Sequence, residues 1–383
     1  MTNGPFADTA RIDARAKVTG APIYGADRHS PNMLHATFAV STIVRGRVTD
    51  IDTRVASAVP GVRMVLTHHD TGVLNPDGFL LTGGHSFQGF QPLLDGEIRH
   101  RGQPIAMIVA KTLEAAMEAA SNISAQYSEE PFASAIESDG ATTIPQSQSP
   151  LPQELFGDTV AGDPLSALEA AETVVDAAFT SPPQHQNPME LVATVAEWNG
   201  DTVTIHEGSQ NSGAVKFGVA RVLGIDPEQV VVISPQVGGG FGQKNSMQMQ
   251  TALVAWVARE AGAPVKMVVP RTQLFHDASF RPQSAHRVRL GADATGRITG
   301  VLYDVDAQSS RHDHLSDGLC KPCGAALRHT QFRRLSADRA DRRADAGVHA
   351  RALRAHGLVR AGLRRRRDGR TFGARPRRVP PGP

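Results

Sequence analysis

Residues 236–245 of this chain read Gln-Val-Gly-Gly-Gly-Phe-Gly-Gln-Lys-Asn, with four glycines around one phenylalanine. The apolar run at 230–233 comes before this stretch and predicts a buried strand, and a segment of helical periodicity begins near Asn245. We therefore expect a strand-to-helix loop. Because glycine has no Cβ, the backbone N–H groups of such a loop can approach a bulky anionic ligand, and the start of the next helix adds positive charge.

The loop matches neither of the common phosphate-binding templates. The dinucleotide fingerprint requires glycine five positions after Gly238, where this chain has Gln243. The phosphate-loop pattern requires Gly-Lys-Ser/Thr, whereas Lys244 lies between Gln243 and Asn245. The spacing alone leaves two interpretations open, a ligand-binding loop and a tight turn that needs several positive φ angles.

The patterns outside the loop predict an α+β fold in two regions. Residues 11–137 alternate short strands with two helices, and residues 164–310 form a second set of strands and helices. Between them, residues 138–163 are rich in Ser, Pro, Gln, Thr and Gly. We expect a linker there, because prolines such as Pro145 oppose regular structure.

Some elements carry clear start and stop signals. Thr112 is expected to cap a helix whose apolar stripe is Leu113, Ala116, Met117 and Ala120. In the second region, Asn199-Gly200-Asp201 predicts a tight hairpin turn, Gly224 and Gly262 are expected to end helices, and Trp256 is expected in the core.

The near-neutral charge of +2 hides two unlike parts. Residues 311–383 contain eighteen Arg and one Lys against six Asp and no Glu, a net of +13, which leaves −11 for residues 1–310. An acidic body argues against nucleic acid as its partner. Both cysteines, Cys320 and Cys323, lie in the basic tail, so we expect no iron–sulfur cluster in the body. We expect a soluble chain without an export signal of its own.

The tail at 311–383 has no sustained periodicity, so we expect it to form no packed core and to be disordered. It is either a disordered basic arm that binds nucleic acid, or the product of a shifted reading frame, which the abrupt change of composition favours. Cys320 and Cys323 resemble half a zinc site, but a structural site needs four ligands, so we expect no metal there.

The body resembles the molybdenum-binding large subunit of the xanthine dehydrogenase and aldehyde oxidase family, in order from about residue 11 to 310. The resemblance is carried by residues 11–13, 17–20, 51–62, 102–105, 185–190, 209–211, 238–244 and 264–271. Residues 41–47 are closest in character to the bacterial aldehyde-oxidising branch.

The resemblance implies a hammerhead-like α/β domain at 11–137 and an incomplete molybdopterin-binding domain at 164–310. By the family pattern, Gln210 donates a hydrogen bond to an oxygen on molybdenum. The backbone of Gly239, Gly240, Phe241 and Gly242 lies against the cofactor. Asn245 stands where many members have a substrate-contacting Glu, which suits a neutral aldehyde. From the residues alone, the favoured role of Gln210 is that of a strand-end amide that satisfies loop carbonyls. His185 and Glu190 are expected to be a structural histidine and a buried acid.

The implied reaction is the oxidation of aldehydes or N-heterocycles with water as the oxygen source. The implied cofactor is molybdenum-molybdopterin, as such or as its cytosine dinucleotide, with an iron–sulfur small subunit and a FAD-binding medium subunit as partners. We expect a cytoplasmic complex, or a periplasmic one exported with a partner that carries a twin-arginine signal. The family's general-base glutamate has no counterpart in this sequence, so no catalytic residue is assigned. We expect a truncated, frame-shifted chain that is inactive alone. The alternatives are an acidic body with a nucleic-acid-binding tail, and a nucleotide-phosphate binder that uses the glycine loop.

Overall fold

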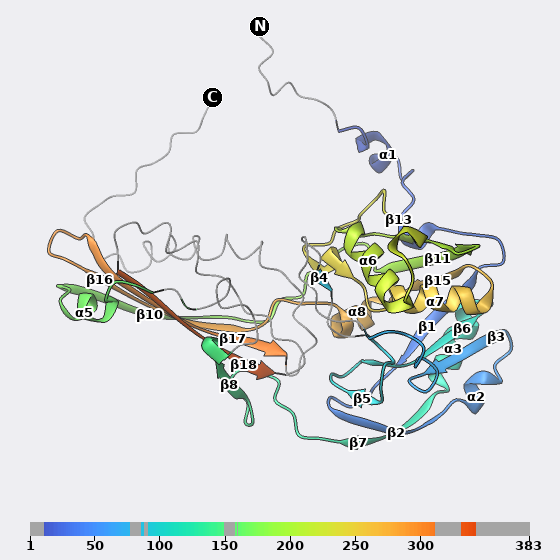
Figure 1. Cartoon of the computed structure of the whole chain (residues 1–383), viewed down its shortest axis with the longest axis horizontal. Coiled ribbons are helices and arrows are strands. Elements are labelled where there is room, and N and C mark those ends of the chain that lie inside the picture. Colours follow the sequence, from blue (N-terminus) through green and yellow to red (C-terminus); the bar gives the residue numbers. More distant parts are fainter. Residues whose placement is uncertain are drawn as a thin grey trace, which may run out of the picture. The chain divides into compact units, whose positions relative to one another are not determined.

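The computed structural model of the chain describes residues 11–76, 86–87, 91–148, 158, 160–310 and 331–341. Its contacts divide these residues into two units (Figure 1). The first unit contains residues 11–132 and 185–280, and the second contains residues 133–184, 281–310 and 331–341. Each unit is built around a sheet of its own.

A seven-stranded mixed sheet organises the first unit, and it draws strands from both halves of the sequence. In order across the sheet these are β13 (Val230–Ile233), β12 (Thr202–Glu207), β11 (Ala193–Asn199), β15 (Val265–Val268), β1 (Leu34–Val40), β6 (Pro104–Ala110) and β3 (Val62–Thr67). β1 pairs in parallel with β15, with Leu34 opposite Val265. β11 and β12 form the predicted hairpin, with Gly200 at a φ of +59° in the turn.

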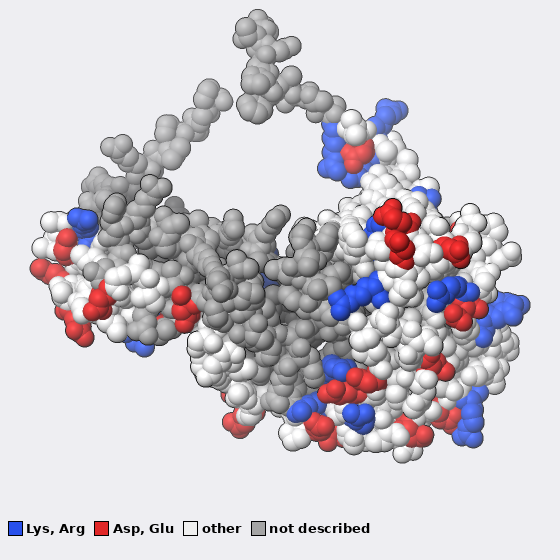
Figure 2. Space-filling model, viewed as in Figure 1, with Lys and Arg blue, Asp and Glu red and all other residues white. Residues whose placement is uncertain are grey.

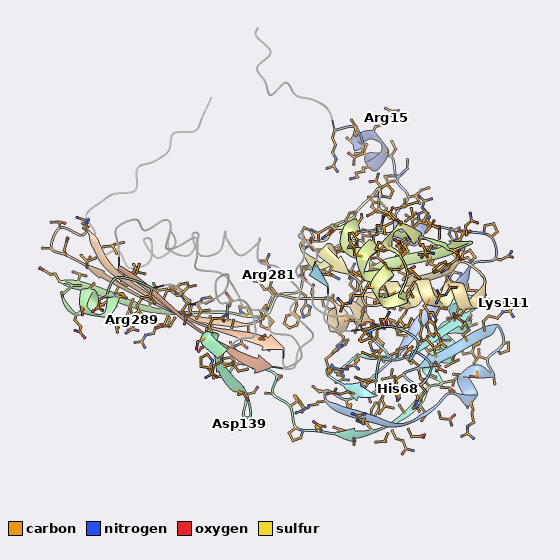
Figure 3. All side chains as sticks on the ribbon, in the orientation of Figure 1. Arg15, His68, Lys111, Asp139, Arg281 and Arg289 are labelled. Carbon is orange, nitrogen blue, oxygen red and sulfur yellow. The ribbon has the colours of Figure 1, made fainter. Side chains whose placement is uncertain are left out.

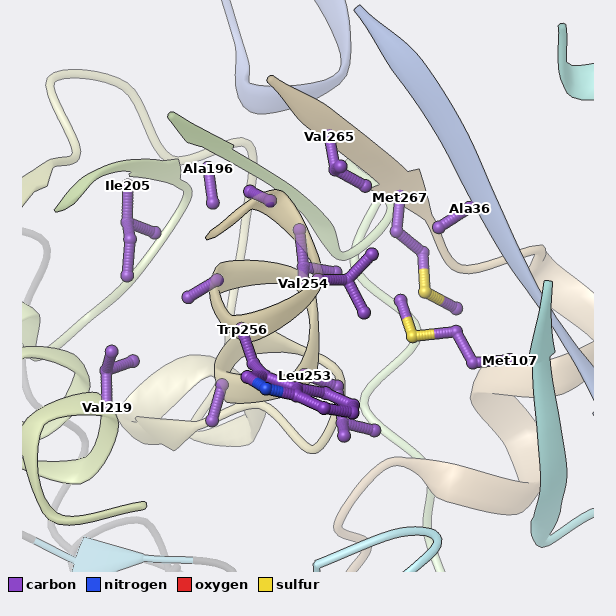
Figure 4. Packing of buried hydrophobic residues seen from close by; sticks show 14 of the residues in the cluster. Ala36, Met107, Ala196, Ile205, Val219, Leu253, Val254, Trp256, Val265 and Met267 are labelled. Carbon is purple, nitrogen blue, oxygen red and sulfur yellow. The ribbon is translucent and has the colours of Figure 1, made fainter. Parts of the chain in front are cut away.

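Two helices pack on this sheet and contribute a large part of its core. They are α6 (Ser212–Leu223) and α7 (Thr251–Ala261), and Gly224 and Gly262 end them in the left-handed conformation, as predicted. Leu253, Val254 and Trp256 of α7 pack with Met107 and Met267 of the sheet (Figure 4). Trp256 retains only 5% of its exposure, which confirms its expected place in the core.

Residues before 132 add a small layer beside β1, β6 and β3. Its elements are α2 (Arg54–Ser57), α3 (Leu113–Ser121) and the three-stranded sheet β5 (Glu97–Ile98), β2 (Gly46–Asp52) and β7 (Ser124–Glu129). Two earlier elements lie outside this layer: α1 (Ala14–Val18), which buries no residue, and a 3-10 turn at Gly25–Asp27, which contacts β11 and β15. The side chain of Thr112 caps α3 as predicted, by accepting from Ala115 N.

The predicted apolar stripe of α3 is only half right. α3 buries Ala116 and Ala119, whereas Leu113 and Met117 are 40% and 56% exposed. The helix contacts β1 and β6 through its alanines. Small side chains let a helix approach a sheet closely, so the larger apolar residues are displaced to the outside.

A second, strongly elongated set of strands organises the other unit. The order is β10 (Thr173–Ser181), β16 (Ser284–Ala292), β17 (Ile298–Ser310), β18 (Gln331–Asp341) and β8 (Thr142–Pro145), with β9 (Val160–Ala161) also paired to β18. Helix α5 (Pro164–Glu169) contacts β16 and β17, and Asp163 caps it through Ser166 N. Arg289 lies on β16 of this sheet and bonds to Asp304 of β17 at 3.3 Å (Figure 3).

The region expected to be an irregular linker contains regular structure. β8, a 3-10 turn at Gln146–Gln148 and β9 all lie within residues 138–163, and Pro145 is the last residue of β8. The expectation that proline excludes a strand is wrong at this position. β8 is at the edge of its sheet, where a residue without an N–H can be accommodated.

The predicted tail is described only at 331–341, where the sequence predicts no regular structure and the chain forms β18. β18 pairs in parallel with β17 from Gly300↔Gln331 to Ser310↔Asp341. Strand pairing uses backbone groups, so it does not require a periodic sequence. Cys320, Cys323 and the Arg364–Arg367 run lie outside the described residues. Among the helices that are described, none has the length and apolarity to span a bilayer.

Candidate functional site

The glycine loop follows β13 and has the strained backbone that its composition predicts. Gly239 and Gly242 have φ values of +104° and +97°, and Phe241 between them has a φ of +51°. A positive φ is unusual for a residue with a side chain. Phe241 is 64% exposed, so the loop presents its aromatic ring outward while the backbone turns beneath it.

The loop does not run directly into a helix, and this part of the prediction is wrong. After the loop the chain forms a 3-10 turn at Gln243–Asn245 and a short strand β14 (Ser246–Met247), which pairs with β4 (Ser86–Phe87). Gln248 Nε2 bonds to the carbonyls of Gln243 and Ser246 and stabilises this path. α7 therefore begins only at Thr251.

The structure brings Gln210 against the loop, although 26 or more residues separate them in sequence. Gln210 lies after β12, and Asn211 next to it caps α6 through Ala214 N. Gln210 Oε1 accepts from Gly242 N at 2.9 Å, and Gln210 N donates to Lys244 O at 2.8 Å. A Cβ at Gly240 would lie 2.2 Å from Gln210 Oε1, so only glycine permits this approach.

Three consecutive backbone amides in the loop are left for another group. Within the described residues, the N–H groups of Gly239, Gly240 and Phe241 donate no hydrogen bond, whereas those of Gly238 and Gly242 on either side are bonded. Gly240 is buried, and buried N–H groups in proteins are nearly always paired. The Nε2 of Gln210 is likewise without an acceptor in the described part of the chain. These donors come from two segments that the hydrogen bond from Gly242 N to Gln210 Oε1 joins.

A buried ion pair lies behind the loop. Lys244 Nζ is 2.6 Å from Glu190 Oε2, and the side chains of Lys244 and Glu190 retain only 1% and 7% of their exposure. The same Glu190 oxygen accepts from Gly238 N at 2.7 Å. The expectation of a buried acid at Glu190 is confirmed. Sequence reasoning did not find Lys244 as its partner, because 54 residues separate the two.

A second buried acid, Glu207, ends β12 one residue before Gly208. Burial raises the pKa of its carboxyl to about 7, against the opposing effect of hydrogen bonds from the Thr194 and Thr251 hydroxyls. The charge of Lys244 lowers this pKa and the charge of Glu190 raises it. Oε1 of Glu207 is buried and has no partner among the described residues. The sequence analysis missed Glu207, since nothing in its neighbourhood distinguishes it from a strand-end acid.

His185 and Arg271 lie beside the segment that leads to Glu190. The ring of His185 stacks on Phe280, with centroids 5.1 Å apart, and Phe275 meets it edge-on at 5.7 Å. Arg271, the first residue of α8 (Arg271–Asp277), donates to Asn187 Oδ1 at 2.8 Å and to Met189 O at 2.9 Å. These ring contacts are consistent with a structural role for His185. Arg271 stabilises the backbone immediately before Glu190.

Asn245 is half-buried in the 3-10 turn, and its backbone N donates to Gly242 O at 3.2 Å. In the described part of the chain no three His, Cys, Asp or Glu groups gather as metal ligands. Among the described residues on the face shown in Figure 2, Lys and Arg are mixed with Asp and Glu. In the described part of the chain, the donors left without an acceptor at this site are the backbone amides of 239–241 and the side-chain amide of Gln210.

Both regions of the chain match the models of known protein families. Residues 19–131 match the a/b hammerhead domain of aldehyde oxidase and xanthine dehydrogenase, and residues 148–332 match the molybdopterin cofactor-binding domain. The chain belongs to the xanthine dehydrogenase and aldehyde oxidase family, with a hammerhead domain followed by a molybdopterin-binding domain. The predicted family and fold class are confirmed.

Similar curated proteins carry the names of molybdenum-enzyme subunits. The aldehyde oxidoreductase molybdenum-binding subunit of Escherichia coli K12 is 33% identical over 297 residues, covering 77% of this chain and 38% of the relative. The nicotine 6-hydroxylase large subunit of Paenarthrobacter nicotinovorans is 29% identical over 297 residues, covering 76% of this chain and 36% of the relative. The chain thus spans less than half the length of these relatives.

Solved structures show the same fold. Quinoline 2-oxidoreductase from Pseudomonas putida 86 superposes with a TM-score of 0.76 at 24% identity, covering 89% of this chain and 45% of that one. Aldehyde oxidoreductase from Desulfovibrio gigas gives a TM-score of 0.75 at 24% identity, covering 88% of this chain and 39% of that one.

Proposed function

We propose that this chain forms one wall of a molybdopterin site in a molybdenum hydroxylase that oxidises aldehydes or N-heterocycles. The observation that carries the proposal is the row of unpaired amides at 239–241 opposite Gln210. Backbone N–H groups of a glycine-rich loop fit the anionic organic part of such a cofactor. When bound, the cofactor supplies the redox chemistry.

Each proposed residue has a defined task. The amides of Gly239, Gly240 and Phe241 bind the cofactor, and Gly242 N orients Gln210 by donating to its Oε1. This leaves Gln210 Nε2 as a neutral donor, which can polarise an oxygen at the reacting centre without competing for its proton. Asn245, on the next turn, contacts substrate, and an uncharged amide there suits a neutral aldehyde.

The partners and the cofactor form belong to the same proposal. An iron–sulfur small subunit and a FAD-binding medium subunit would carry electrons away, because we assign neither centre to this chain. The cofactor is molybdopterin or its cytosine dinucleotide, and the complex is cytoplasmic or exported with a twin-arginine partner. We propose that the chain is inactive alone, because none of its residues is assigned as the general base that the reaction needs.

The test is to express the chain in cells that make molybdopterin, with and without candidate partner subunits. The molybdenum content and the pterin content of the purified protein are then measured, together with the rate of aldehyde-dependent dye reduction. We expect pterin in the purified chain and no turnover by the chain alone. A chain that lacks pterin and instead binds ATP or NAD would overturn the proposal, and robust turnover by the isolated chain would overturn the claim of inactivity.

A further inference from the structure

The proposed function gives no task to Glu190, yet this side chain contacts both ends of the glycine loop. Its Oε2 accepts from Gly238 N at 2.7 Å at the start of the loop and from Lys244 Nζ at 2.6 Å at its end. The backbone of Glu190 also donates to Gly238 O at 3.2 Å. The unpaired amides at 239–241 lie between these two contacts.

The surrounding chain leaves room for Glu190 by using glycine. A Cβ at Gly208 would lie 2.8 Å from Glu190 Oε1, and a Cβ at Gly238 would lie 2.6 Å from Glu190 Cβ. Gly208 comes two residues before Gln210, so the Glu190 side chain packs against both the segment that carries Gln210 and the glycine loop. Side chains at either glycine would push the two segments apart.

The buried pair is not explained by stability. Replacing a buried ion pair with apolar residues of similar volume is often neutral or stabilising, because both charges lose their hydration. What Glu190 and Lys244 provide is geometry. Lys244 O accepts from Gln210 N at 2.8 Å, so the position of Lys244 also sets the position of Gln210.

We propose that Glu190 is a positioning residue, which acts through Gly238 and Lys244 to hold the amides of 239–241 opposite Gln210. Its role towards the cofactor rests on the proposed function; its role in ordering the loop does not. Glu190 itself touches neither cofactor nor substrate. Arg271 donates a hydrogen bond to Met189 O and so stabilises the backbone next to Glu190.

Two double variants separate positioning from simple charge burial. Glu190→Gln with Lys244→Met removes both charges but keeps a side-chain oxygen for Gly238 N. Glu190→Leu with Lys244→Met also removes both charges and leaves Gly238 N without an acceptor. The two differ only at the group that the inference concerns. Glu190→Asp, which keeps the charge and shortens the reach to Gly238, serves as a second probe if the leucine variant does not fold.

The first measurement is amide exchange at residue level in the cofactor-free chain, with the thermal midpoint as a check on the fold. Because hydrogen bonds to charged groups are stronger than neutral ones, we expect Gly238 exchange to rise about fiftyfold in the leucine variant and about fivefold in the glutamine variant. In Glu190→Asp, the Gly238 amide is expected to exchange faster than in the wild type. Unchanged exchange in the leucine variant, or in a folded Glu190→Asp, overturns the inference.

The second measurement is pterin content after expression with cofactor synthesis. The leucine variant is expected to hold at least fivefold less pterin than wild type, and the glutamine variant at least half as much. A leucine variant with wild-type pterin overturns the positioning role. If wild type holds no pterin while the exchange rates follow the expected order, the proposed function fails and the ordering of the loop by Glu190 stands.

Discussion

At the scale of single residues, the site depends on close approaches that only certain side chains allow. Gln210 reaches Gly242 N because Gly240 has no Cβ, and Glu190 reaches Gly238 N because Gly208 and Gly238 have none. Gly238 and Gly240 were visible in the sequence as part of a glycine cluster, whereas Gly208 was not singled out. Their partners were not visible, because a hydrogen bond between residues 210 and 242 leaves no local pattern.

Gly240→Ala tests the closest of these approaches. The added Cβ would lie 2.2 Å from Gln210 Oε1, so loop and side chain must separate and the Gly242 bond is expected to break. We expect pterin content to fall at least tenfold while the thermal midpoint changes by only a few degrees, since the loop is outside the core. Gly72→Ala, where an added Cβ would meet no atom within 4 Å and the φ is not positive, is the control for an added methyl. Equal pterin in both variants would contradict this prediction.

Glu207→Gln tests the buried acid at the end of β12. Its pKa is raised from 4.5 to about 7, so the folded chain binds the proton more tightly than the unfolded chain. The contribution of Glu207 to the free energy of unfolding is fully present below pH 4.5 and is lost as the pH rises through 7. The change is about 3 kcal/mol.

The free energy of unfolding, measured with urea at several pH values from 4.5 to 8, checks this sign. The wild type is expected to lose stability across the window, and Glu207→Gln is expected to lack that part of the slope. Glu190 and Lys244, which face Glu207, are kept unchanged. Glu197→Gln, at an exposed position on β11, is the control and should behave as wild type.

At the scale of elements, local signals predicted most starts and stops correctly. The Thr112 cap, the Asn-Gly hairpin and the left-handed glycines after α6 and α7 all depend on residues within one turn of the chain. The errors arose where a distant contact decided the outcome. Pairing of β14 with β4 delays α7 to Thr251, and close packing on the sheet selects the alanine face of α3.

Thr112→Ala is expected to destabilise the chain by about 1 kcal/mol, because the Ala115 amide loses its cap. Thr53→Ala is a matched control, since Thr53 is also an N-cap residue but its side chain makes no cap bond. Urea unfolding of both variants measures the difference. A cost at Thr53 equal to that at Thr112 would show that capping is not the cause.

At the scale of the whole molecule, one sheet joins parts of the chain that the sequence analysis assigned to separate regions. Leu34 of β1 lies opposite Val265 of β15, and the Leu34 amide donates to Pro264 O at 2.8 Å. The core on this sheet likewise combines Phe38 and Met107 with Leu253 and Met267.

Separate expression of residues 1–137 and 138–383 tests this dependence. Each fragment would expose one edge of the seven-stranded sheet and part of its apolar core. We expect weak tertiary signal from each fragment alone, and co-purification with restored near-UV circular dichroism when they are produced together. Two fragments that unfold cooperatively by themselves and do not associate would contradict it.

The sequence by itself determined the family, the α+β class, the glycine loop and the residue types that its site uses. These follow from local periodicity, caps and motifs, which act within a few residues. Only the tertiary structure decided which groups meet: Gln210 with Gly242, Glu190 with Gly238 and Lys244, and β1 with β15. The physical reason is that hydrogen bonds, burial and strand pairing act through space, so their partners are set by the fold and not by distance along the chain.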